Sequence, residues 1–253
     1  MLNIRIIPAL LLSNIGLVKG AKFSKHRYIG DPINTVKIFN DKEVDELIFF
    51  DINATNESRS PNFELLSDIA SQAFMPFGYG GGLHNVKQVE RLFKIGAEKA
   101  IINSAAVYNK QLVRDASSIA GSQSIVVSID VKKNILGKHI VYTHSGTIKS
   151  GFDVVDYSRR IEDAGAGEII ICSIDREGTN LGFDKELIKS VSESVNIPVV
   201  ASGGAGKISH FKQAVDLGAS AISAGNIFIF HGKHRAVLIT YPEREDLKRL
   251  FKD

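Results

Sequence analysis

The amino-acid sequence predicts an α/β protein, a single (β/α)8 barrel over residues 1–253 built from two duplicated halves, on three observations. Short apolar runs alternate with amphipathic stretches along the whole chain, which is typical of strands alternating with helices. One part of the chain repeats another: residues 76–107 align with residues 198–228 under a constant shift in residue number. The length of 253 residues suits one barrel, and no linker-like segment divides it.

The repeat shows how the two halves correspond. Each copy reads as a short apolar strand, a Gly-Gly turn, an amphipathic helix and a second apolar strand, which is the order of a βαβ unit. The shift places Gly81–Gly82 on Gly203–Gly204, and further upstream it places Glu46 on Glu168. The duplication therefore extends beyond the glycines. The half-barrels are expected at about residues 1–122 and 123–253.

Eight strands are expected, and their near-continuous Ile, Val, Leu and Phe runs are typical of parallel strands that are covered on both faces. A doubly wound open sheet is the alternative arrangement. It would not explain the repeat, whereas two four-stranded halves can close on each other. The expected strands are Arg5–Leu12, Glu46–Asp51, Pro76–Gly80, Lys99–Asn103, Ser124–Asp130, Glu168–Ser173, Pro198–Ser202 and Ala221–Ala224.

Eight amphipathic stretches separate or follow these strands and are expected to be helices. Pro32 and Pro61 stand at first-turn positions, where proline is favoured. Gly96, Gly165 and Gly218 stand just past helix ends, where glycine is favoured. The expected helices are Pro32–Val44, Pro61–Ala73, Asn85–Ile95, Gln111–Ala120, Val154–Ala164, Lys185–Val195, Ile208–Leu217 and Glu243–Phe251.

Composition and charge narrow the class of protein. The chain is 44% hydrophobic and 23% charged, as in ordinary globular proteins, and its net charge of +3 suits anionic small molecules. No run of like charges points to a nucleic-acid partner. The one cysteine, Cys172, excludes an internal disulfide and favours the reducing cytoplasm. The apolar run RIIPALLL is too short for a signal peptide or a membrane span.

Glycine pairs follow the third and seventh expected strands. Ligands of such barrels bind at the carboxyl ends of the strands, and Gly-Gly turns ahead of a helix let backbone N–H groups approach an anion. Small polar residues follow the neighbouring strands. Together with these residues, the two glycine pairs predict two phosphate sites that face each other across the mouth. Such a pair of sites suits a molecule with a phosphate near each end. Alternatively, the glycines only make tight turns. The expected set is Gly81, Gly82, Asn103, Ser104, Gly178, Thr179, Gly203, Gly204, Gly225 and Asn226.

Asp130 ends the fifth expected strand and should point into the mouth of the barrel. A carboxylate there can act as a general acid or base. The alternatives are a helix cap or an ion pair with Lys132. Asp51 and Asp175 also end strands, although Asp175 lies in the sequence DREGT and could instead order that loop.

Four charged residues stand at the opposite, amino-terminal ends of strands. Their signs alternate, so they could pair into a ring at the bottom of the barrel. From the residues alone, this ring predicts stability rather than catalysis. Its members are Arg5, Glu46, Lys99 and Glu168.

A series of motifs gives the chain a family resemblance. RIIP, VKG, GDP, DELIFFDI, GGG, KAIIN, GSQ, SID, GAGEI, SIDREGT and ASGGAGK follow in order up to about residue 230. In this it resembles the cyclase subunit of imidazole glycerol phosphate synthase from histidine biosynthesis. The resemblance implies two phosphate sites for a bisphosphorylated ribonucleotide, and a glutaminase docked as a heterodimer on the amino-terminal face. It also implies that ammonia passes through the barrel, that the charged ring is its gate, and that Lys19 belongs to a mobile loop after the first strand.

The chain departs from that family at the first strand. The family has an acid–base aspartate within Cys-Leu-Asp-Val, whereas this chain reads Ala-Leu-Leu-Leu and Leu11 takes the aspartate position. One general acid–base group is typically worth about 10²–10⁴-fold in rate. Asp130 is retained, so the resemblance implies that half of the catalytic pair is missing.

A second departure covers residues 226–242, which carry His231, Lys233, His234 and Arg235 and are expected near the phosphate site after the eighth strand. They could dock another protein or an anionic substrate, or form a solvated basic loop. The two histidines lack a third ligand, so no metal site is expected, and no cofactor is expected either.

Both departures resemble divergent paralogues found with bacterial surface-polysaccharide genes, which work with a glutaminase and a sugar amidotransferase. Three hypotheses follow. The chain could conduct ammonia for amidation of a surface sugar, it could be an authentic histidine-pathway cyclase, or it could be a non-catalytic scaffold that activates a glutaminase.

Overall fold

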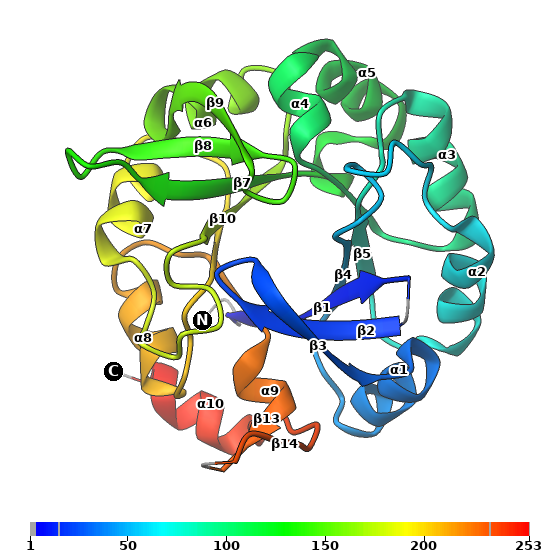
Figure 1. The fold of residues 1–253 in the computed structure, drawn as a ribbon, viewed down its shortest axis with the longest axis vertical. Coiled ribbons are helices and arrows are strands. Elements are labelled where there is room, and N and C mark those ends of the chain that lie inside the picture. Colours follow the sequence, from blue (N-terminus) through cyan, green and yellow to red (C-terminus); the bar gives the residue numbers. More distant parts are fainter. Residues whose placement is uncertain (1–3, 15, 233, 253) are drawn as a thin grey trace.

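A computed structural model describes residues 4–14, 16–232 and 234–252, which form the closed parallel barrel that the sequence predicts (Figure 1). Each barrel strand pairs in parallel with the next, and β10 pairs with β7 to close the ring. The fold-class prediction is therefore confirmed. The barrel strands are β1 Arg5–Ser13, β4 Leu47–Asp51, β5 Phe77–Gly80, β6 Lys99–Ile102, β7 Ile125–Lys133, β10 Glu168–Ser173, β11 Val199–Ser202 and β12 Ala221–Ala224.

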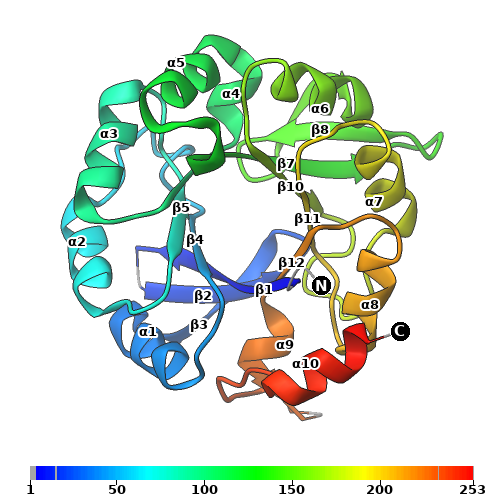
Figure 2. The same ribbon diagram turned by 180° about the vertical axis from the view of Figure 1, so that it is seen from behind.

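Helices surround the barrel on its outer side, as both ribbon views show (Figures 1 and 2). They are amphipathic and bury one apolar stripe each against the strands, apart from the last, whose residues are not buried. Their bounds are α1 Pro32–Asp41, α2 Phe63–Gln72, α3 Val86–Ile95, α4 Ser104–Tyr108, α5 Lys110–Ala120, α6 Val154–Glu162, α7 Lys185–Ser192, α8 Ser209–Val215, α9 Asn226–Ile229 and α10 Arg244–Phe251, with a 3₁₀ turn at Ser122–Ser124.

Local capping explains where the helices begin and end. Asp31 caps α1 by accepting a hydrogen bond from the Asn34 N–H, and Pro32 stands in its first turn, as expected. The same expectation for Pro61 was wrong, because Asn62 is the cap of α2 and Pro61 precedes it. Among the described residues, no helix is both long and apolar enough to cross a bilayer.

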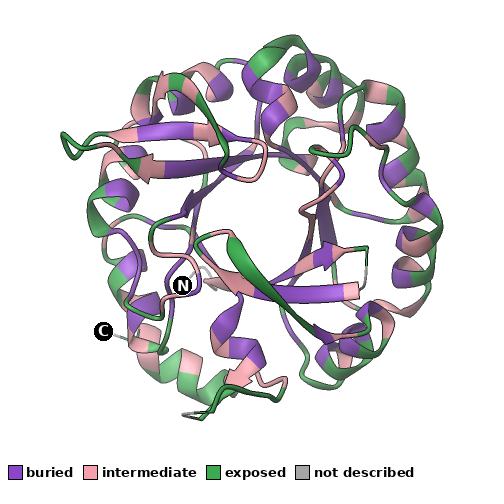
Figure 3. Ribbon diagram, viewed as in Figure 1, coloured by how far each residue is buried: buried purple, intermediate pink, exposed green. Residues whose placement is uncertain are grey.

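Two antiparallel hairpins extend opposite sides of the barrel over its mouth. β2 (Gly16–Ala21) and β3 (Ser24–Gly30) extend β1, and β8 (His139–Thr143) and β9 (Ile148–Asp153) extend β7. The first hairpin corrects the sequence expectation of a long loop after the first strand. The sequence did not indicate this hairpin, because β3 is exposed along most of its length and therefore lacks the apolar run of a buried strand (Figure 3). The half-barrel boundary near residue 122 stays a prediction.

The residues after α9 form a small hairpin on the outer side of the barrel, made of β13 (Phe230–His231) and β14 (Ala236–Val237). Its described basic residues do not line the cavity at the mouth. The expectation that they lie near an anion site stays a prediction. Lys233 lies outside the described residues. The chain then returns to the barrel, and the Tyr241 hydroxyl donates a hydrogen bond of 2.8 Å to the Ile6 carbonyl.

Two separate apolar layers make the core. The larger lies between strands and helices, and the smaller fills the barrel axis. The axial layer takes one residue from each of seven strands, since alternate strand residues face opposite sides of the sheet. Its members are Ile7, Ile48, Ile101, Val126, Ile170, Val200 and Ala221.

We expect Ile161→Ala on α6 to lower the free energy of unfolding by about 2–5 kcal/mol, because its fully buried side chain would leave a cavity between helix and sheet. Ile135→Ala is the matched control, since Ile135 is fully exposed, and it should change the same quantity by less than about 0.5 kcal/mol. Urea denaturation of both variants measures the difference. Equal losses would contradict this packing.

Candidate functional site

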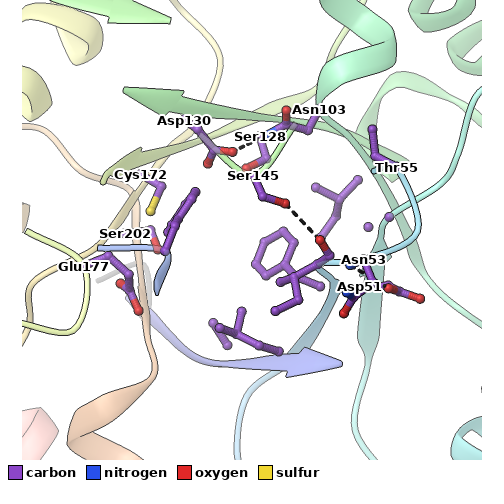
Figure 4. A pocket seen from close by; sticks show the side chains of 18 of the residues that line it. Asp51, Asn53, Thr55, Asn103, Ser128, Asp130, Ser145, Cys172, Glu177 and Ser202 are labelled. Carbon is purple, nitrogen blue, oxygen red and sulfur yellow. Dashed lines mark hydrogen bonds between the residues drawn. The ribbon is translucent and has the colours of Figure 1, made fainter. Parts of the chain in front are cut away.

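A cavity of about 360 Å³ opens at the carboxyl ends of the barrel strands (Figure 4). This volume lies within the range of small-molecule sites. Polar side chains from several different strands and loops converge on it, above the apolar axial layer. The lining residues discussed below are the apolar Leu11 and, besides it, Lys19, Asp51, Asn103, Asp130, Cys172 and Glu177.

Asp130 is the buried carboxylate of this cavity. Burial raises its pKa from 3.8 to about 7, and the nearby Glu177 adds to the rise. The Asn103 amide opposes the rise by donating a hydrogen bond of 2.9 Å to the carboxylate. Lys132 is not its ion-pair partner, because that ammonium donates to the Gly146 carbonyl at 2.7 Å. A carboxyl group that titrates near neutrality can donate or accept a proton.

Leu11 lines the cavity from β1, on the same side of that strand as the axial residue Ile7. β1 and β7 stand four strands apart in the ring of eight, so Leu11 and Asp130 face each other across the mouth. In the structure the apolar side chain of Leu11 therefore stands across the mouth from the carboxyl group of Asp130.

Two other carboxylates line the cavity, and neither replaces an acid at position 11. Asp51 forms two hydrogen bonds with the Arg59 guanidinium, at 2.7 and 2.8 Å, and accepts two more from the N–H groups of Asn53 and Ala54. It orders the loop after β4. Glu177 follows β10, which is the direct neighbour of β7, so it stands on the side of Asp130.

Lys19 is almost completely buried on β2, in the hairpin that was expected to be a loop. Its ammonium lies against Gly225, where any Cβ would collide with the Nζ atom. Burial lowers the pKa of Lys19, and the charge of Glu177 opposes that shift. Glycine at position 225 therefore admits the lysine side chain to the mouth.

The first hairpin also contacts the loop after β10. The Lys22 N–H donates to the Glu177 carbonyl at 2.9 Å, and a Cβ on Gly178 would overlap the Gly20 carbonyl. The Asn226 amide donates to the Gly178 carbonyl at 2.9 Å. These contacts close the part of the mouth near β12.

The expected phosphate residues therefore divide into two groups. Gly81, Asn103, Ser104 and Gly225 line the cavity. The others lie behind the first hairpin or within their own loops, and they are Gly82, Gly178, Thr179, Gly203, Gly204 and Asn226. Gly81, Gly82, Gly203 and Gly204 all have positive φ, which favours glycine, so tight turns alone would also require them. Phosphate binding at either group stays a prediction.

The four charged residues at the bottom of the barrel form a closed ring of ion pairs. Arg5 pairs with both glutamates, and Lys99 Nζ lies 3.1 Å from Glu46 and 2.6 Å from Glu168. The glutamate side chains are 4% and 6% exposed, whereas Arg5 is 33% and Lys99 is 17% exposed. The cations therefore face the solvent side, and the apolar axial layer separates the ring from the mouth.

Sequence reasoning missed several features of the cavity. Glu177 lies in the sequence motif SIDREGT, but no role was assigned to it. Cys172 was considered only as the one cysteine of the chain, yet it lines the cavity, and burial raises the pKa of its thiol. Ser145 reaches the cavity from the β8–β9 turn, where it donates to the Ile52 carbonyl at 2.9 Å. Alternation along β10 could have placed Cys172 inward, on the same side as Ile170.

One group of possible metal ligands occurs among the described residues, on the outer side of the barrel. His139, Asp184 and Glu186 place one ligand atom each within 4.8 Å of one another. The Lys133 ammonium already lies 2.6 Å from Glu186 and 3.8 Å from Asp184. Because the Lys133 ammonium already pairs with these carboxylates, we interpret the group as an ion-pair cluster and not as a metal site.

Comparison with known proteins identifies the family. The model of a family described as "Histidine biosynthesis protein" matches residues 5–235. A protein of Pseudomonas aeruginosa named "Putative imidazole glycerol phosphate synthase subunit hisF2" is 45% identical over 244 residues, which cover 96% of this chain and 97% of that protein. The chain belongs to the HisF family. The resemblance to the cyclase subunit of imidazole glycerol phosphate synthase is thereby confirmed.

Other HisF relatives match over nearly the same length. A Leptospira interrogans protein named "Putative imidazole glycerol phosphate synthase subunit HisF" is 44% identical over 253 residues, covering 99% of this chain and all of that protein. The Petrotoga mobilis protein named "Imidazole glycerol phosphate synthase subunit HisF" is 42% identical over 229 residues, covering 90% and 91%. The HisF family comprises subunits of an enzyme, so this chain is a HisF-like cyclase subunit.

The raised pKa of Asp130 makes stability depend on pH. Between pH 3.8 and about 7 the folded chain holds a proton that the unfolded chain has released, so the free energy of unfolding falls as pH rises. From about pH 5 to about pH 8, we expect the wild type to lose on the order of 1–3 kcal/mol relative to Asp130→Asn, whose amide does not titrate. Urea denaturation across this range measures the difference. Parallel profiles would contradict a buried, titrating Asp130.

Proposed function

We propose that this HisF-family chain receives ammonia from a partner glutaminase and delivers it to the barrel mouth for amidation of a surface-polysaccharide sugar. In this proposal it no longer carries out efficient ring closure on the bisphosphorylated ribonucleotide. The observation that carries the proposal is Leu11, which faces the cavity opposite Asp130. A leucine side chain exchanges no protons, so one carboxyl group would have to do the work of two.

The axis of the barrel suits the passage of a small neutral molecule. The charged ring stands at its amino-terminal entrance, and the axial layer of Ile, Val and Ala side chains follows. An ammonium ion would lose its hydration among these side chains, whereas neutral ammonia loses far less. The ring residues match the family's gate, and the glutaminase would dock on this face. A sugar amidotransferase would use the ammonia at the opposite face.

An authentic histidine-pathway cyclase is the second candidate, and two observations favour it. Asp130 has a pKa near neutrality, and Gly81, Asn103 and Ser104 leave one predicted phosphate cradle open to the cavity. The Petrotoga mobilis relative carries the plain name of the synthase subunit. Growth of a histidine auxotroph separates this candidate from the proposed function.

We expect the wild-type chain not to support growth of a bacterial strain that lacks its own HisF cyclase, because Leu11 cannot transfer a proton. Leu11→Asp should restore ammonia-dependent cyclisation by about 10²-fold or more if the missing acid is the main defect. Leu11→Asn is the matched control, since its amide has the same shape without the acid. Robust growth with the wild-type chain would rule out the proposed function.

The gate can be tested on the complex with a glutaminase from the same genome. Lys99→Met removes the ion pairs of Lys99 with both glutamates, so we expect it to lower transfer of glutamine nitrogen to the mouth by at least tenfold while free ammonium is still used. Lys189→Met, at an exposed surface ion pair, is the control. The same complex tests the scaffold hypothesis. If the chain activates the glutaminase as strongly without a phosphorylated ligand as with one, the result would favour a non-catalytic scaffold.

A further inference from the structure

Two stretches of the chain contain no acidic residue, although the chain averages one in nine. They are residues 1–30 and 217–242, and no Asp or Glu occurs in either. Both carry basic residues that the proposed ammonia path does not use. The absence of acidic residues means that these cations cannot be neutralised from within their own segments.

The fold places these two stretches side by side. β1 pairs with β12, and the hairpin that extends β1 reaches the segment after β12 (Figure 1). The Arg27 guanidinium donates a hydrogen bond of 3.2 Å to the Arg235 carbonyl, which joins β3 to the turn between β13 and β14. Residues 208 positions apart in the sequence therefore meet at the rim of the mouth.

Both arginines also stack on one aromatic ring. The guanidinium carbon of Arg27 lies 5.3 Å from the centroid of the Phe230 ring, and that of Arg235 lies 4.5 Å away. Such cation–π contacts hold a guanidinium in place while leaving most of its N–H groups free. The two positive charges are thus kept close together, which costs energy unless an anion is nearby.

Neither guanidinium has a carboxylate partner among the residues that the structure describes, and both side chains are exposed. Arg244, another exposed arginine, does have such a partner in Glu43. The partly buried Arg59 likewise pairs with Asp51. The free N–H groups at the rim are therefore available to a ligand.

The cluster continues into the cavity at the mouth. His26, the residue before Arg27, lines the cavity, and Arg27 is the register partner of Lys19 across the first hairpin. Basic side chains thus lead from the buried Lys19 ammonium to the rim. A molecule that enters the mouth could extend an anionic group outward along this path.

We propose that Arg27, Arg235 and Phe230 form a rim anion site, which binds the diphosphate group of a substrate too long to be enclosed by the mouth. Paired guanidinium groups match phosphate oxygens in a bidentate manner, and a diphosphate offers enough oxygens for both. The site is separate from the predicted Gly-Gly phosphate cradles, which lie after other strands. It takes a diphosphate ester, and it does not depend on which reaction occurs in the mouth.

Calorimetric titration of the full chain with pyrophosphate and with adenosine diphosphate tests the site. We expect the double variant Arg27→Gln/Arg235→Gln to bind both probes at least tenfold more weakly at the rim, with any binding in the mouth unchanged. Lys22→Gln/Lys25→Gln removes the same amount of charge, all of it from the hairpin that carries Arg27, and should change binding less than threefold. Adenosine should not bind at this site, because it has no phosphate group and the aromatic ring of Phe230 alone would not hold it.

Equal weakening by the two double variants would overturn the site, because it would reduce the effect to the general positive charge of the hairpin. Unchanged binding in Arg27→Gln/Arg235→Gln, or no binding by the wild type, would overturn it as well. Glutamine-dependent nitrogen transfer is measured on the same samples and should be unchanged in Lys22→Gln/Lys25→Gln. A failure of transfer in the wild type would count against the proposed function and leave the rim result standing.

Discussion

Side-chain alternation along the eight parallel strands is the constraint on which the rest of this structure depends. Alternate residues of each strand face the barrel axis, so a single strand supplies three different environments in sequence. β1 places Arg5 in the charged ring, Ile7 in the axial layer and Leu11 in the mouth. A one-residue shift would turn all of these side chains toward the helices. The charged ring, the axial layer and the cavity at the mouth are therefore fixed together by strand register.

Much of this could be predicted from the sequence. The apolar runs predicted the strands to within one residue, except that β7 continues three residues beyond Asp130, and the strand ends placed Leu11 and Asp130 at the mouth. The hairpin after β1 could not be predicted, because β3 is exposed and lacks an apolar face. The burial of Lys19 depends on that hairpin, and so does the closure of the mouth beside Gly225. The pKa of Asp130 could not be predicted either, since it depends on burial, which the sequence does not give.

The mouth is asymmetric although the sequence is duplicated. The half near β5 and β6 remains open, while the first hairpin and the loop after β10 cover the half near β12. The same hairpin carries the basic residues that lead to the rim. One structural element therefore closes one predicted phosphate cradle and presents Arg27 outside it. This arrangement suits a ligand that lies across the rim better than one that is wholly enclosed.

The central claim is that the mouth keeps its ligand contacts but lacks half of its proton-transfer pair. The most direct measurement follows binding and turnover of the bisphosphorylated ribonucleotide in one sample, with free ammonium supplied and the Petrotoga mobilis HisF as reference. Our account expects the ligand to bind while imidazole glycerol phosphate forms at least about 10²-fold more slowly than with the reference protein. Turnover at the rate of the reference protein, with leucine still at position 11, would contradict it.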